Sequence, residues 1–154
     1  MEENIKIVAR NKKASYEYFL SDFLECGIEL KGTEIKSIKQ LAASLNESYV
    51  IIKNGEAFIV GMNVSLYDKG NIFNHDVTRT RKLLLHKREI IKLAQKVKEK
   101  GFTLVATKLY LKRGRAKLEI ALAKGKKLYD KREVEKQRDI KRVTKQYNEN
   151  YKTL

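Results

Sequence analysis

Apolar residues recur at two spacings along this chain, and each spacing predicts a different kind of element. A period of two, typical of strands with one buried face, runs through residues 16–30, 49–60 and 103–123. A period of 3.6 replaces it from Lys87 to Lys100, which predicts an amphipathic helix that Gly101 is placed to end. The chain is therefore predicted to be mostly sheet with at least one long helix.

Two hairpins are the sharpest local predictions. Asn54-Gly55 separates the apolar runs 49–53 and 56–60, and this dipeptide tolerates the positive φ values of a type I′ turn. The second hairpin joins residues 103–111 to 115–123 through a turn at 112–114. In its last strand Leu118, Ile120 and Leu122 share one face, while Lys117 and Glu119 share the other.

The first third of the chain gives weaker signals. Residues 1–14 are predicted to be a basic leader without regular structure. Tyr16 and Tyr18 are predicted to lie on one face of a strand, either as a base-stacking platform or as part of the sheet wall. Thr33 is predicted to be the N-cap of a short helix with Glu34 in its first turn and Ile35, Ile38 and Leu41 on one face. Residues 67–81 are predicted to form a long loop, and the leucines that follow to anchor the entry to the long helix.

These elements together predict a small closed β-barrel of the oligonucleotide-binding (OB) type, with about three helices. Closure is expected because it removes the exposed edges of so short a sheet. The barrel is predicted to occupy residues 1–124, and residues 125–154 to form a flexible basic C-terminal tail.

Charge is what separates the tail from the rest. Residues 125–154 hold 10 Lys and Arg against 5 Asp and Glu, and the preceding 124 residues hold 24 against 14, so the net charge per residue roughly doubles at Gly125. Eight apolar or aromatic positions are too few to bury a core of their own. Asp130 and Glu133 resemble a capping box, so the tail is predicted to be disordered when free and helical against phosphates.

The whole chain of 154 residues has a formal charge of +15 and a pI near 9.8, which favours nucleic acid as the partner over a membrane. A soluble protein that is basic by chance is the plain alternative. No apolar run reaches the roughly 18 residues of a membrane span. The N-terminus lacks the basic start of a signal peptide, so a cytoplasmic location is expected. One cysteine, Cys26, gives no disulfide framework or zinc cluster, and no metal or cofactor is expected.

Candidate catalytic chemistry is sparse. Asn74-His75-Asp76 is the one segment that could be read as a catalytic or metal-binding pair, and His86 is the only other histidine. No acidic cluster stands at ligand spacing and no P-loop or nucleophile elbow is present, so we expect no enzyme activity. A nuclease that uses His75, Asp76 and His86 remains the enzyme alternative.

Two cationic motifs are the better candidates for function. Residues 79–82 contribute Arg79, Arg81 and Lys82 directly before a leucine run. Residues 125–132 combine four cations, which suit phosphates, with Tyr129, which offers a plane for an unpaired base. A solvated linker is the plain alternative for this second motif.

The motifs stand in an order that resembles the SsrA-binding proteins, also called small protein B. The resemblance runs from about residue 6 to residue 145. It is carried by Asn11-Lys-Lys-Ala, Gly32-Thr-Glu-Ile-Lys-Ser, Glu47-Ser-Tyr, Asn54-Gly-Glu, Asn74-His-Asp, Arg79-Thr-Arg-Lys-Leu-Leu-Leu-His, Leu109-Tyr and Ala123-Lys-Gly-Lys-Lys-Leu-Tyr-Asp-Lys-Arg.

The resemblance implies a non-enzymatic RNA adaptor of trans-translation. Its barrel would bind the tRNA-like domain of transfer-messenger RNA (tmRNA), and its tail would enter the decoding centre and empty mRNA channel of a stalled ribosome. With the cationic motifs, the implied RNA-binding residues are Asn11, Lys12, Lys13, Glu25, Arg79, Arg81, Lys82, Leu84, Lys117 and Lys124. The implied ribosome-binding residues of the tail are Lys126, Lys127, Tyr129, Asp130, Lys131 and Arg132.

Two questions stay open at this point. Glu25 is unexpected on an RNA-binding face because a carboxylate repels phosphate; it either accepts a hydrogen bond from a base amino group or orients a neighbouring lysine. A permanent ribosomal protein, whose basic tail threads ribosomal RNA, is the alternative from a different class.

Overall fold

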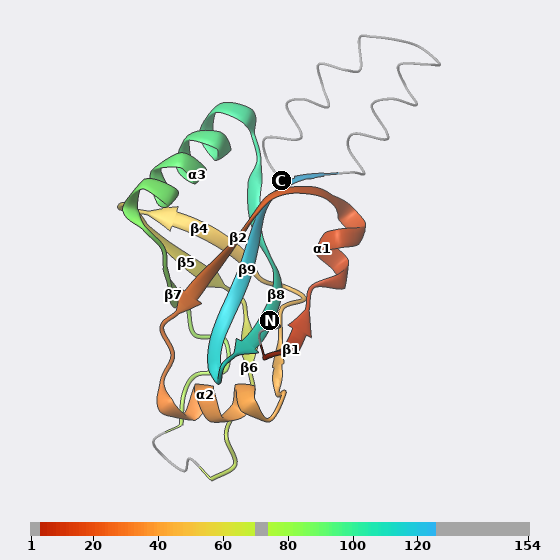
Figure 1. Ribbon diagram of the computed structural model, residues 1–154, viewed down its shortest axis with the longest axis vertical. Helices are drawn as coiled ribbons and strands as arrows, with labels where there is room; N and C mark the ends of the chain where they lie inside the picture. The colour runs from red at the N-terminus through yellow and green to blue at the C-terminus, as the bar shows by residue number, and fades with distance from the viewer. Residues whose placement is uncertain (1–3, 70–73, 126–154) are drawn as a thin grey trace.

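The computed structural model describes residues 4–69 and 74–125 (Figure 1). Within these ranges it has three helices and nine strands. In chain order they are β1 (Ile5–Arg10), α1 (Lys12–Glu17), β2 (Tyr18–Ile28), α2 (Gly32–Lys39), β3 (Ala43–Ser44), β4 (Tyr49–Lys53), β5 (Glu56–Val60), β6 (Asn63–Val64), β7 (Arg81–Leu84), α3 (Lys87–Lys100), β8 (Thr103–Lys112) and β9 (Arg115–Gly125).

Seven of these strands form one antiparallel sheet in the order β1-β8-β4-β5-β7-β2-β9. β9 also pairs with β8, so the order returns to β8 and the strands make a ring with β1 added beside it. The short strands β3 and β6 pair with each other. Figure 1 shows α3 and α2 at opposite ends of the molecule. A mostly-sheet protein with about three helices is therefore confirmed.

The core fills the inside of this ring. Every strand of the ring contributes a buried apolar side chain, for example Ile59 of β5, Leu83 of β7 and Leu118 of β9. Leu93 of α3 and Ile38 of α2 belong to the same cluster. The helices thus close the two ends of a core that alternation on the strands directs inward.

Both predicted hairpins are confirmed. Asn54 and Gly55 have φ values of 53° and 77°, as a type I′ turn requires. At the second turn Arg113 and Gly114 have φ values of 54° and 81°. Lys112 pairs with Arg115, so the loop is two residues long, not the three predicted, and Lys112 belongs to β8.

The predicted unstructured leader is wrong for its described residues from Ile5 onward. β1 pairs with residues 108–112 of β8. β4 pairs with β8 near the other end of that strand, at Val50 and Leu104. The second half of β8 would otherwise present an open edge, and β1 satisfies its backbone groups.

The shared strand face predicted for Tyr16 and Tyr18 is also wrong. Tyr16 lies in helix α1 with 84% of its surface exposed, whereas Tyr18 opens β2 and is half-buried. Asn11 causes the difference, because its side-chain oxygen accepts a hydrogen bond from the Ala14 N–H at 3.0 Å and so starts the helix.

Helix α2 begins one residue before the predicted N-cap. Thr33 lies inside the helix, and the Glu34 carboxylate accepts a hydrogen bond from the Lys31 N–H at 2.7 Å. Ile38 is fully buried as predicted, but Leu41 follows the helix with a φ of 63° and is 48% exposed. Leu41 therefore does not extend the apolar face of α2.

The leucine run does not lead directly into a helix. Residues 81–84 form strand β7 between β5 and β2, with Arg81 and Leu83 directed inward and Lys82 and Leu84 outward. Helix α3 then has the predicted bounds, and Gly101 ends it in the left-handed conformation with a φ of 71°.

Candidate nucleic-acid interface

An open groove lies where β2, β7 and the start of α3 meet. Its volume is about 730 Å³, and it is lined by residues 25–27, 54–56, 82–87, 89, 90 and 117. We call it the β2–β7 groove. It brings together Glu25, Lys82, Leu84 and Lys117 of the predicted RNA-binding residues. These positions are spread over 93 residues of sequence, so the fold is what gathers them.

Strand register explains how they meet. Gly27 of β2 pairs with Leu84 of β7 on one side and with Lys117 of β9 on the other. Lys117 in turn pairs with Tyr110 of β8, so one row crosses four strands. Paired residues face the same side of a sheet, and Leu84, which is 49% exposed, marks that side as the outer one.

Gly27 keeps this row open. A Cβ atom at this position would stand 3.3 Å from Cδ1 of Leu84 and 3.4 Å from its Cβ. The absence of a side chain at Gly27 therefore leaves the row open beside Leu84.

Glu25 is held in the groove by groups from a different strand. The Tyr110 hydroxyl of β8 donates a hydrogen bond to Glu25 Oε2, and Lys112 Nζ lies 3.4 Å from both carboxylate oxygens. The hydrogen bond from Tyr110, followed by Lys112, lowers the pKa of Glu25. The groove thus contains a fixed, ionised carboxylate among its cations.

Lys82 is one of three lysines that line the groove, with Lys87 and Lys117. Its ammonium lies 2.7 Å from Glu56 Oε2, with about a third of its side chain exposed. The hydrogen bond to Glu56 raises the pKa of Lys82. Because both partners reach solvent, this ion pair can open to admit a phosphate at little cost.

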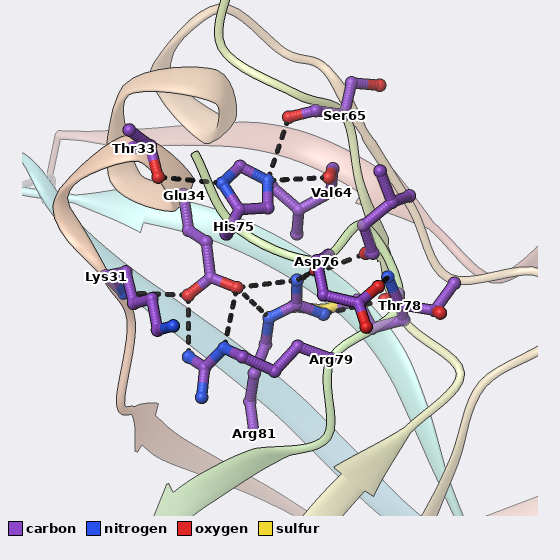
Figure 2. Close-up of polar contacts among 12 residues, drawn as sticks. Lys31, Thr33, Glu34, Val64, Ser65, His75, Asp76, Thr78, Arg79 and Arg81 are labelled. Atoms are coloured by element: carbon purple, nitrogen blue, oxygen red, sulfur yellow. Dashed lines mark hydrogen bonds and ion pairs between the residues drawn. The ribbon is translucent and has the colours of Figure 1, made fainter. Parts of the chain in front are cut away.

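Arg79 and Arg81 belong to a separate, largely buried cluster around Glu34 (Figure 2). Arg79 binds the carboxylate with two nitrogens, at 2.7 Å and 3.1 Å. Arg81 binds it at 2.7 Å and also donates to the carbonyl oxygens of Met62, Asp76 and Val77. The cluster ties α2 to the segment that leads into β7.

Electrostatics keep this cluster charged. Burial alone raises the pKa of Glu34, but hydrogen bonds from Arg79, the Lys31 N–H and Arg81 outweigh it and bring that pKa down to about 2. The Arg81 side chain is 0% exposed and its guanidinium is bonded inside the cluster, so it presents no surface to solvent. Its part in RNA binding stays a prediction. Arg79 keeps 28% exposure, at the rim of the cluster.

His75 has a structural place beside the same cluster. Its Nδ1 lies 2.8 Å from the Thr33 hydroxyl, and its Nε2 lies 2.9 Å from the Val64 carbonyl oxygen. The ring is 4% exposed. Both nitrogens are therefore occupied, and His75 fastens the loop before β7 to α2 and β6.

Asn11, Lys12 and Lys13 lie away from the β2–β7 groove. Asn11 is 5% exposed, and its amide donates to the Ala106 carbonyl oxygen at 2.9 Å while it caps α1. Its side-chain polar groups are thus bonded within the fold, although Asn11 also lines the smaller groove described next. Its contact with RNA stays a prediction. Lys12 and Lys13 are exposed on α1, and Lys13 lines a smaller groove of about 340 Å³ and pairs with Glu47 at 3.5 Å.

Lys124 lies near the end of β9, half-buried, where it pairs in register with Phe19 of β2. It is therefore outside the set that lines the β2–β7 groove. The predicted tail residues Lys126, Lys127, Tyr129, Asp130, Lys131 and Arg132 lie outside the described residues.

Sequence reasoning missed Tyr110 and Lys112. Both stand on β8 at alternate positions with Lys108, whose ammonium lies 5.8 Å from the centre of the Tyr110 ring. This Lys-x-Tyr-x-Lys alternation was a usable sign of a polar outer face. The contact between Tyr110 and Glu25 could not be predicted from this pattern, because the two residues are 85 positions apart in sequence.

In residues 4–69 and 74–125, no group of three or more His, Cys, Asp or Glu side chains is arranged to hold a metal ion. No helix there has both the length and the apolar character needed to cross a membrane.

Comparison with known proteins agrees with the motif order. The family model described as SmpB protein matches residues 8–150. SsrA-binding proteins from Caldicellulosiruptor bescii and Caldanaerobacter subterraneus are 51% and 53% identical to this chain over 150 and 148 residues, which is 95% and 96% of it and 95% and 94% of the relatives. A solved chain described as "tmRNA-SmpB: a journey to the center of the bacterial ribosome" superposes with a TM-score of 0.64 and 41% identity, over 76% of this chain and 82% of that one.

Proposed function

We propose, from the premise that this chain belongs to the SmpB protein family, that it binds the tRNA-like domain of tmRNA and delivers it to stalled ribosomes. The observation that carries this proposal is the β2–β7 groove. Its lining joins three lysines, a half-exposed leucine and a fixed carboxylate. Phosphate, apolar and hydrogen-bonding contacts to structured RNA need such a mixture.

The ring of strands is, in this proposal, a closed barrel of the OB type. Support comes from the β8–β9 pairing, which returns the strand order to its start, and from the core cluster inside the ring. Such a barrel presents a rigid outer face, and a rigid face suits recognition by shape, phosphate and 2′-hydroxyl contacts.

The RNA-binding set within this proposal is Lys12, Lys13, Glu25, Arg79, Lys82, Leu84, Lys117 and Lys124. Arg81 and Asn11 are proposed to support these contacts from within the fold, because their polar groups are buried and bonded. Glu25, Lys82, Leu84 and Lys117 form the groove contacts. The exposed cations on α1 serve a second RNA surface.

The two parts of the chain are proposed to bind different partners, with the boundary at Gly125. Residues 1–124 hold tmRNA, and residues 125–154 enter the decoding centre and the empty mRNA channel, disordered when free and helical on the ribosome. The net charge of +5 over these 30 residues supports a polyanion as their partner. The protein is an adaptor without enzyme activity, and it acts in the cytoplasm.

A truncation experiment tests the proposal. A chain that ends at Lys124 should bind the tRNA-like fragment of tmRNA as the full chain does, but should support no tagging of stalled peptides in a reconstituted translation system. Loss of both activities would contradict the division at Gly125. A chain that sediments with ribosomal subunits after a salt wash, whether or not they are stalled, would instead favour a permanent ribosomal protein.

A further inference from the structure

The carboxylates that line the β2–β7 groove are not equivalent. Glu56 is bonded to Lys82 at 2.7 Å, and Glu89 accepts from the His86 N–H at 2.8 Å at the start of α3. Glu25 instead receives the Tyr110 hydroxyl on Oε2, while its described contact on Oε1 is Lys112 at 3.4 Å. Its side chain keeps 38% exposure. Oε1 therefore has room to accept a strong hydrogen bond from outside.

The group that fixes Glu25 is itself rigid. Tyr110 is 5% exposed and stands on β8, which β9 separates from β2. The hydroxyl and the carboxylate are 85 residues apart in sequence. Their contact is thus set by the closure of the ring and not by a flexible neighbour.

An ionised carboxylate only accepts hydrogen bonds. It repels phosphate, so its presence among Lys82 and Lys117 selects a different part of an RNA: an amino or imino group of a base, or a ribose 2′-hydroxyl. The open row at Gly27 and the half-exposed Leu84 leave space for a base or sugar beside it. Lys117 is close enough to help lower the pKa of Glu25, and it can take the adjoining phosphate.

We propose that Tyr110 is a positioning residue which, together with Lys112, holds Glu25 so that its carboxylate accepts an N–H or O–H hydrogen bond from the bound RNA. This inference rests on the proposed function of the groove and goes beyond it, because it assigns Glu25 to recognition of a donor group and not to the ordering of lysines.

A double-mutant cycle tests the positioning role. The dissociation constant for the tRNA-like fragment of tmRNA is measured for the full chain, Tyr110→Phe, Glu25→Ala and the double variant. Tyr110→Phe should weaken binding about 5-fold and Glu25→Ala about 10-fold, with no further loss in the double variant. The salt dependence should not change in Tyr110→Phe, because no phosphate contact is lost.

Tyr67→Phe is the matched control, since Tyr67 lies under Lys36 and outside the groove. Its affinity should equal that of the full chain. Thermal unfolding of each variant separates a loss of binding from a loss of fold. If Tyr110→Phe unfolds early, Lys112→Met replaces it in the same cycle. Wild-type affinity in Tyr110→Phe, or an equal loss with and without Glu25, would overturn the positioning role.

Modified RNA identifies the donor. Loop nucleotides of the fragment are replaced one at a time by inosine for guanosine, which removes a base amino group, or by the 2′-deoxynucleotide. One replacement should cost the full chain about 5-fold in affinity and cost Glu25→Ala nothing. If no replacement depends on Glu25, the acceptor role is wrong. If the full chain does not bind the unmodified fragment at all, the proposed function itself is wrong.

Discussion

Strand β7 carries two neighbouring cations, of which one is buried and the other is exposed to solvent. Arg81 points inward and lies 2.7 Å from Glu34, with both side chains 0% exposed. Lys82 points outward and lies 2.7 Å from Glu56, with side-chain exposures of 36% and 49%. The separations are equal, so distance does not distinguish the two pairs. Solvent does, because a buried pair cannot be broken without leaving an unpaired charge in the core, whereas an exposed pair can exchange its partner for water or phosphate.

The largest expected effect comes from breaking the buried pair. Arg81→Met should lower the free energy of unfolding by about 3 to 5 kcal/mol, because Glu34 loses a charged partner and three carbonyl oxygens lose their donor. Lys82→Met, the neighbouring control, should leave stability nearly unchanged. Urea denaturation followed by circular dichroism measures both. Equal losses in the two variants would show that burial does not separate them.

The pH dependence of stability provides a second test of the difference between the buried and the exposed ion pair. The pKa of Glu34 is about 2 in the folded chain against a usual 4.5, so its ionised form stabilises the fold above pH 4.5, and this contribution disappears as the pH falls toward 2. The contribution is about 3 kcal/mol.

Glu34→Gln should therefore be less stable than the wild type at pH 7, and the gap should close between pH 4.5 and pH 2. Glu56→Gln, the exposed counterpart, should be nearly as stable as the wild type at pH 7, because a surface ion pair contributes little. Free energies of unfolding across this range check both expectations. A gap of constant size for Glu34→Gln would mean that its carboxylate is not held ionised by the two arginines.

The exposed cations on the outer face of the sheet are tested by measuring RNA binding. Lys117→Ala should weaken binding of the tRNA-like fragment about 10-fold at moderate salt and leave the unfolding free energy unchanged. If the body neutralises roughly six phosphates, the logarithm of affinity should fall with the logarithm of salt with a slope of about −4 to −5, and the variant should lose about 0.8 from that slope. Lys39→Ala, on α2, is the matched control. An unchanged slope would remove Lys117 from the phosphate contacts.

Sequence alone predicted the elements whose cause is local. Helix α3 and the Asn54-Gly55 hairpin follow from a periodic stripe, a glycine and a turn dipeptide, all within a few residues. β1 could not be predicted in the same way, because it forms to cover the end of β8 that β4 does not pair with, about a hundred residues later in the chain.

The candidate site also has a part that the sequence predicted and a part that depends on the fold. The positions of Glu25, Leu84 and Lys117 followed from resemblance, but their meeting in one groove depends on the register of β2 with β7 and β9. The burial of Arg81 was not predicted, because the leucine run indicates the entry to a helix. Read as a strand, the alternation of Arg81 with Leu83 would have placed the guanidinium inside.

The smallest expected effect concerns Gly27 in the groove. Gly27→Ala places a methyl group 3.3 Å from Leu84 Cδ1, and Leu84, which is half-exposed, can shift by a few tenths of an ångström to admit it. Stability should therefore change by less than about 0.5 kcal/mol, whereas RNA affinity should fall about 2- to 3-fold because the methyl occupies the space beside Glu25. Gly32→Ala is the control, since its added Cβ would meet nothing within 4 Å. Binding assays on the three proteins decide the point, and equal affinities would mean that the bound RNA does not approach the backbone of β2 at Gly27.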